Sequence, residues 1–142
     1  MRLRRVTHYL AVGLMLATIA SCSFTTANIS SLKLSKDKEG SAQTNSFAPG
    51  DTVYAIATVS NNPGKVTLKF QLIAEKVEGE RENFHVSNLD MSLEVDGDRT
   101  ATYHVEPPPA GWPAGRYRIE VAMLTEKGEQ KDQETGTFTV SK

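Results

Sequence analysis

The chain has 142 residues, of which 39% are hydrophobic and 23% charged, and its formal net charge is −1. This length and composition are typical of one soluble globular domain. A single cysteine, Cys22, excludes an intramolecular disulfide and a cysteine-based zinc site. The sequence also lacks a strong basic patch, which argues against nucleic acid as a partner.

The first segment, residues 1–21, has the pattern of an export signal. Three arginines at positions 2, 4 and 5 precede the apolar run at 9–20, and small residues follow it. The run is shorter than the ~20 residues of a membrane-spanning helix. We therefore expect an exported protein whose signal peptide is removed.

The end of this signal resembles the lipobox of bacterial lipoproteins. Ile19-Ala20-Ser21-Cys22 places an aliphatic residue and two small residues before the cysteine. The resemblance implies cleavage between Ser21 and Cys22, lipidation of the Cys22 sulfur with acyl chains such as palmitate, and a short tether at 22–27. The alternative is an ordinary secretory signal, with cleavage after Ala27 and no lipid.

A lipid anchor would make the membrane a partner through acyl chains alone. Loss of residues 1–21 removes three arginines and no acid, so the net charge becomes −4, which gives no attraction to anionic headgroups. Two or three acyl chains hold a protein at a bilayer far longer than one. Ser23, in place of the aspartate that retains enterobacterial lipoproteins at the inner membrane, implies the outer membrane in a Gram-negative host.

Residues 28–142 show period-two patterns separated by turn signals, and they contain no convincing amphipathic helix. Between the strands we expect a polar connection at 36–51, a turn at 61–64, a charged loop at 75–83, a two-residue hairpin at Asp96-Gly97 and a last turn region at 126–134. The expected strands are 29–35, 52–60, 66–73, 84–95 with a break near 87–88, 100–106, 116–124 and 137–140. The pattern predicts an all-β fold, an antiparallel immunoglobulin-like β-sandwich of about seven strands, with a barrel as the competing architecture. Both faces of 52–60 are fairly apolar, so the sequence does not say which face is buried.

The segment 113–117, PAGRY, resembles the tyrosine corner of immunoglobulin-like domains. Tyr117 follows Gly115 by two residues, although Pro113 stands where that corner has an aspartate. The resemblance implies a hydrogen bond from the Tyr117 hydroxyl to the nearby backbone.

Alternating strand directions predict two groups of loops at opposite ends. Residues 60–64, 96–98 and 125–133 should lie at the end where the first strand begins, and a lipid at Cys22 would hold that end near the bilayer. Residues 36–51, 75–82 and 106–115 should face away from it, and we expect a partner-binding surface there.

The candidate binding loop contains Trp112, Pro109, Pro113 and Arg116. Trp112, the sole tryptophan, is either an exposed platform for a glycan or a Pro-rich peptide, or a plug that closes the end of the core; we favour the plug. His85 and His104 fall on expected strands, and the sequence leaves open whether they are neighbours beside an acid. It predicts no catalytic residues, no metal site and no cofactor.

These patterns favour a membrane-anchored bacterial envelope lipoprotein that is not an enzyme and acts as a binding or assembly module for a protein partner. The step from fold to binding rests on analogy. One alternative is a small envelope enzyme or enzyme inhibitor, which would be favoured by a histidine buried beside a carboxylate in a pocket. Another is a structural spacer subunit of an envelope complex.

Overall fold

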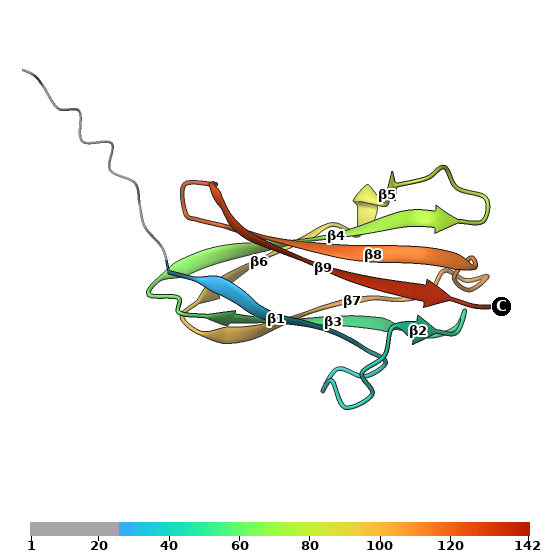
Figure 1. Cartoon of the computed structure of the whole chain (residues 1–142), viewed down its shortest axis with the longest axis horizontal. Helices are drawn as coiled ribbons and strands as arrows, with labels where there is room; N and C mark the ends of the chain where they lie inside the picture. Colours follow the sequence, from blue (N-terminus) through green and yellow to red (C-terminus); the bar gives the residue numbers. More distant parts are fainter. Residues whose placement is uncertain (1–25) are drawn as a thin grey trace, which may run out of the picture.

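The computed structural model describes residues 26–142, and these form two packed β-sheets. The predicted signal peptide, the lipobox and most of the tether lie outside the described residues. The first sheet has the order β1-β3-β7, and the second has the order β2-β9-β8-β4-β5, with β6 also paired to β4 (Figure 1). Their bounds are β1 Asn28–Ser35, β2 Ser46–Phe47, β3 Val53–Ser60, β4 Lys65–Val77, β5 Phe84–His85, β6 Met91–Asp96, β7 Arg99–Val105, β8 Gly115–Leu124 and β9 Gln130–Val140.

The strand order confirms the predicted immunoglobulin-like sandwich. Strands β1, β3 and β7 correspond to A, B and E of that fold, and they face β9, β8, β4 and β6, which correspond to G, F, C and C′. Neighbouring strands are antiparallel except β2, which runs parallel to β9. Among the described residues the helical structure is one 3₁₀ turn, η1 (Ser87–Leu89), and no helix there is long and apolar enough to cross a bilayer.

The buried face of β3 is the one that carries Val53, Ala55, Ala57 and Val59, all fully buried. On its other face, Ile56 is also buried because the loop after β1 covers it: a Cβ at Gly40 would lie 3.0 Å from the Ile56 Cδ1 atom. Both faces are therefore apolar for different reasons, one within the core and one beneath a loop.

The predicted hairpin at Asp96-Gly97 is wrong. The link passes from one sheet to the other, since β6 pairs with β4 and β7 pairs with β3. The β3–β4 loop holds this turn in place: the Gly97 amide donates to the Gly64 carbonyl oxygen (2.9 Å), and the Asn62 side-chain amide donates to the Gly97 carbonyl oxygen (2.9 Å). Non-local hydrogen bonds thus replace those of a hairpin.

Two expected loops are shorter than predicted. Strand β9 begins at Gln130, inside the expected turn region at 126–134, and β4 continues to Val77, inside the expected charged loop. The first eight residues of β9 are exposed or half-buried, so this part of the strand lacks the apolar alternation that marks a strand in the sequence. The predicted break near 87–88 is confirmed, because η1 separates β5 from β6.

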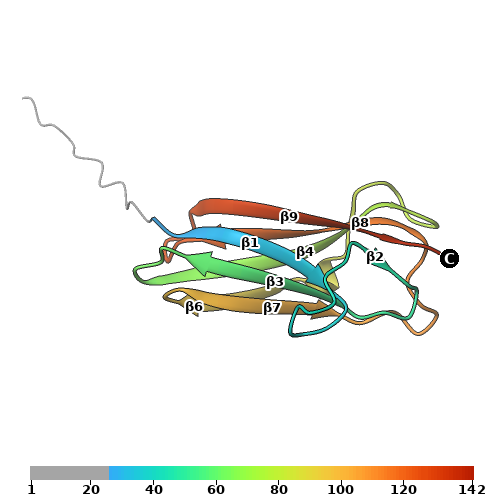
Figure 2. The ribbon, with the colours of Figure 1, turned by 60° about the horizontal axis from the view of Figure 1, so that its bottom comes forward.

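The predicted grouping of the loops is confirmed (Figures 1 and 2). We call the end formed by residues 61–64, 97–98 and 125–129 the proximal end, because Thr26 lies there and donates a hydrogen bond to the Asn61 carbonyl oxygen (2.7 Å). The opposite, distal end is formed by residues 36–52, 78–90 and 106–114 and includes the C-terminus. Ala27 is already buried in the core, so the sandwich begins inside the predicted tether.

Candidate binding site

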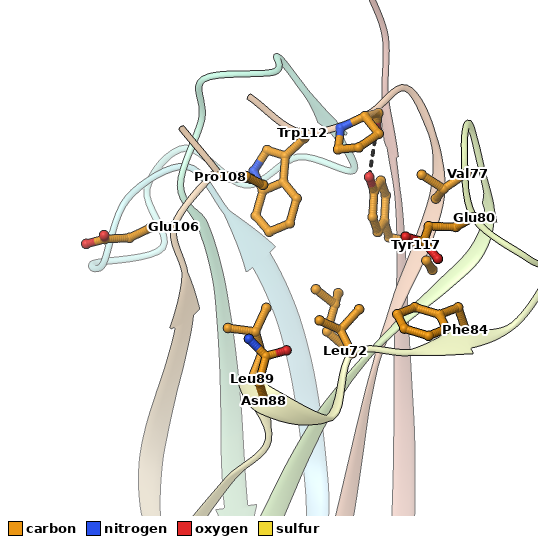
Figure 3. A pocket seen from close by; sticks show the side chains of 13 residues that line it. Leu72, Val77, Glu80, Phe84, Asn88, Leu89, Glu106, Pro108, Trp112 and Tyr117 are labelled. Atoms are coloured by element: carbon orange, nitrogen blue, oxygen red, sulfur yellow. Dashed lines mark hydrogen bonds between the residues drawn. The ribbon is translucent and has the colours of Figure 1, made fainter. Parts of the chain in front are cut away.

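A pocket of about 340 Å³ opens at the distal end, between the two sheets. Figure 3 shows Leu72 between two walls, one with Trp112 and Leu89 and the other with Tyr117 and Phe84. This volume is near the lower end of the range for ligand pockets, about 300–1,000 Å³. The pocket suits a small group or a side chain.

Trp112 is the plug that we favoured, and the exposed-platform interpretation is wrong. Its side chain is 6% exposed, and its indole Nε1–H donates to the Asp51 carbonyl oxygen at 2.8 Å. The Trp112 backbone amide also donates to the Pro49 carbonyl oxygen at 2.8 Å. These bonds fix the ring over the end of the core, where one side of it lines the pocket.

Tyr117 forms the predicted corner. Its hydroxyl donates to the Pro113 carbonyl oxygen at 2.7 Å (Figure 3), and its ring stacks on Phe138 with centroids 5.1 Å apart. Trp112 meets the same ring edge-on at 5.7 Å. Burial, with a smaller effect of the Glu80 charge, raises the pKa of Tyr117 to about 12, so its hydroxyl remains a donor at physiological pH.

Gly115 makes this corner possible. Its φ is +148°, and a Cβ there would overlap the Lys76 carbonyl oxygen and lie 2.6 Å from Val77 Cα. Only glycine lets β8 start this close to the end of β4. The close approach places Tyr117 beside the pocket.

Both walls are completed by β5 and the segment that follows it up to β6, which the sequence did not assign to a site. Phe84, Val86 and Leu89 line the pocket and are only partly buried. Tyr103 holds η1 against β7, because its hydroxyl donates to the Leu89 carbonyl oxygen at 2.7 Å. The break predicted near 87–88 was the one available signal, since it implied that residues around it leave the sheet.

Two carboxylates, Glu80 and Glu106, lie on opposite sides of the pocket, and Figure 3 shows the Glu106 carboxylate turned outward. Neither has an ion-pair or side-chain hydrogen-bond partner among residues 26–142. Nearby acids are paired instead: Glu75 with Arg116 at 3.2 Å and Glu78 with Lys142 at 3.0 Å. The lining therefore carries two carboxylates that form no ion pair, and the Arg81 guanidinium lies next to it, over the Phe84 ring.

The structure brings together only part of the predicted binding loop. Trp112 and Pro113 line the pocket, whereas Pro109 is exposed outside the lining. Arg116 also lies outside the lining, in its ion pair with Glu75.

The two histidines are not neighbours. His85 Nε2 lies 2.7 Å from Asp90 Oδ1 at the edge of the second sheet, while His104 on β7 packs against Tyr54 with ring centroids 5.8 Å apart. Neither histidine lines the pocket. His85 is partly exposed and His104 is exposed. Within the described residues no group of three or more histidine, cysteine or acidic side chains is placed to hold a metal ion.

Comparison with known proteins does not identify a function for this site. No protein-family model matches the chain, and no curated protein matches it. The functional proposal therefore depends on the pocket and on the sequence pattern at Cys22.

Proposed function

We propose that this protein is a lipid-anchored lipoprotein of the bacterial envelope whose β-sandwich is a non-catalytic binding module for a protein partner. The lipobox at Ile19-Ala20-Ser21-Cys22 supports the anchor. The pocket at the distal end supports binding. In a host with two membranes, Ser23 favours the outer membrane.

The observation that carries the proposal is that the pocket and Thr26, the first described residue, lie at opposite ends of the sandwich. Thr26, four residues after Cys22, is hydrogen-bonded to Asn61 at the proximal end, and four extended residues span about 14 Å. A lipid on Cys22 would hold the proximal end at the bilayer. The pocket then faces away from the membrane, where a partner can reach it.

The enzyme alternative called for a histidine buried beside a carboxylate in a pocket. His85 lies beside Asp90, but both are partly exposed and neither lines the cavity. Apolar side chains and the rings of Trp112 and Tyr117 make up most of the wall. These features favour binding over catalysis.

Metabolic labelling with an alkyne analogue of palmitate tests the anchor. We expect the wild-type chain to be labelled and to remain with the membrane fraction, and Cys22→Ala to lose both properties because the thiol that accepts the lipid is gone. Mass spectrometry of the mature protein should find Cys22 as the modified first residue. An unmodified Cys22 in the mature wild-type protein contradicts the anchor.

A photo-crosslinking amino acid at two exposed prolines tests the binding surface. At Pro109, on the distal end, we expect an adduct with one defined envelope protein, and at Pro63, on the proximal end, we expect none. Val86→Phe, which fills the pocket, should remove the adduct, while the matched change Leu93→Phe on β6, outside the lining, should keep it. Adducts that form at Pro63, or that persist in Val86→Phe, contradict the proposed surface.

A further inference from the structure

We propose that the distal pocket takes one apolar side chain of its protein partner, from a segment in which basic residues flank that side chain; this inference rests on the proposed function. Three observations support it. The polar groups of the two aromatic rings in the wall already have hydrogen-bond partners, the cavity has the size of one side chain, and acidic residues lie at its mouth.

The wall offers an occupant few polar groups. The indole N–H of Trp112 is bonded to the Asp51 carbonyl oxygen, and the Tyr117 hydroxyl is bonded to the Pro113 carbonyl oxygen. No buried side-chain nitrogen or oxygen among the described residues lacks a partner. A sugar needs several donors and acceptors around it, and the Asn88 amide is the one uncharged polar side chain of the lining that has no partner among residues 26–142. The occupant is therefore apolar at the depth of the pocket.

The size of the pocket limits that occupant to a short group. The pocket volume of about 340 Å³ accommodates one large side chain, and Leu72 forms the base of the pocket (Figure 3). The side chains of Phe84, Val86 and Leu89 are only partly buried in the free protein. Covering them would remove more apolar surface from water and favour association.

The charge at the mouth selects a cation beside the apolar group. Glu80 and Glu106 have no positive partner, and Arg81 lies over the Phe84 ring at 5.3 Å from its centroid. Lysine or arginine on either side of the inserted residue would meet these two carboxylates. An anionic lipid headgroup would instead be repelled, which favours a protein segment over a lipid as the occupant.

Trp112 reports occupancy directly, because it is the sole tryptophan of the chain and lines the pocket. The full chain, reconstituted in neutral phosphatidylcholine vesicles, is titrated with a blocked pentapeptide that has phenylalanine between two pairs of lysines. Matched peptides replace phenylalanine with serine, or the lysines with glutamates. We expect a saturable change in fluorescence with the first peptide alone, weakening as salt is added.

Variants test each part of the inference. Glu80→Gln and Glu106→Gln should each raise the Kd about two- to fivefold, the range for exposed charge pairs, whereas Glu126→Gln, an exposed acid at the proximal end, should leave it unchanged. Val86→Phe should abolish binding and Leu93→Phe should not. Circular dichroism verifies that each variant is folded.

Several results would overturn the inference. Equal binding of the glutamate-flanked peptide would refute the role of charge, and equal binding of the serine peptide would refute the apolar insertion. A response to phosphatidylglycerol vesicles and to no peptide would identify a lipid as the occupant. If no peptide binds while the Pro109 adduct still forms and Val86→Phe removes it, the inference fails and the proposed function stands.

Discussion

At the proximal end a buried amide holds the two turns that cross between the sheets, whereas at the distal end a group of aromatic rings covers the core. Asn62, 8% exposed, donates from its side chain to the Val95 and Gly97 carbonyl oxygens, and its backbone amide donates to Asp98 Oδ1 at 2.8 Å. Trp112, Tyr117 and Phe138 form the distal closure. The proximal end is thus closed by hydrogen bonds between short loops. The distal end is closed by aromatic rings, and a cavity remains beside their faces.

This difference between the two ends indicates which end of the sandwich can bind a ligand. A second pocket, of about 350 Å³, lies at the proximal end, but Lys65, Glu94 and Glu126 are among its lining residues, so it presents charged groups where the distal pocket presents rings. At the distal end the same rings that finish the core also line an open pocket, so stability and recognition share residues. Mutations at the two ends should therefore change stability by different amounts.

The start of β8 should be the most sensitive position of the distal end. Gly115→Ala places a Cβ inside the backbone of β4 at a φ that alanine rarely adopts, so we expect the free energy of unfolding to fall by about 3–5 kcal/mol. Urea unfolding followed by Trp112 fluorescence measures it. Gly50→Ala, where a Cβ meets nothing within 4 Å, is the control and should cause no loss. A loss below about 1 kcal/mol in Gly115→Ala would show that β8 and β4 can move apart.

The amide at the proximal end should be the next most sensitive position. Asn62→Ala removes the donors to Val95 and Gly97 and leaves their carbonyl oxygens without that partner, so we expect a loss of about 2–3 kcal/mol. Asn88→Ala, at an exposed asparagine of the distal end, should change stability by less than about 0.5 kcal/mol. If the two variants unfold alike, hydrogen bonds do not close the proximal end.

Alkaline pH should act on the distal end through two tyrosines. Burial raises the pKa of Tyr103 and of Tyr117 to about 12, with the charges of Asp90 and Glu80 adding to the two shifts, whereas an unfolded tyrosine ionises near 10. The unfolded state thus releases these protons first as the pH rises. Stability should be unaffected below pH 10 and should fall between about 10 and 12, by at most about 1.4 kcal/mol per pH unit for each tyrosine.

Tyr103→Phe and Tyr117→Phe should each reduce this slope. At neutral pH each change should also cost about 1 kcal/mol, because the bonds to the Leu89 and Pro113 carbonyl oxygens are lost. Urea unfolding at pH 7, 9, 10 and 11 gives both quantities for each variant. A wild-type slope retained in the double variant would assign the alkaline transition to other groups.

The sequence predicted those parts of the fold that depend on local pattern. Val66, Leu68 and Phe70 alternate with polar residues, and β4 buries them. The resemblance of residues 113–117 to the tyrosine corner implied the hydrogen bond of Tyr117, and the structure has it. Each of these features lies within one strand or one turn, so neighbouring residues are enough to specify it.

The parts that were missed depend on non-local pairing. Asp96-Gly97 has the same turn preference whether the next strand returns to its own sheet or crosses to the other, and Asn62, distant in sequence, holds the crossing turn. The pocket was missed for a similar reason. Phe84 and Val86 share one face of the expected strand and Leu89 begins the alternation after its break, so none of them stands out in the sequence. The packing of η1 against β7 leaves all three only partly buried.

The smallest effect should come from the loop after β1, which covers the outer face of the first sheet at its distal end. The Asp37 carboxylate accepts hydrogen bonds from the Ala42 amide (3.0 Å) and from the hydroxyls of Ser35 and Ser41, and these bonds hold its pKa well below the usual range. Asp37→Asn should increase amide exchange at Ala42 roughly severalfold at pH 7 while barely changing the midpoint of global unfolding.

The pH dependence of the Asp37 hydrogen bonds provides a control for the effect of Asp37→Asn. Because the pKa of Asp37 is lowered by folding, its contribution is complete above about pH 4 and is lost as the pH falls through the lowered pKa. In the wild type, protection of the Ala42 amide, corrected for intrinsic exchange, should persist at pH 3. Glu39→Gln, an exposed acid of the same loop, should leave it intact at both pH values. Loss of protection in the wild type near pH 4 would mean that the bonds to Asp37 do not order the loop, and that the cover over Ile56 depends on apolar contact alone.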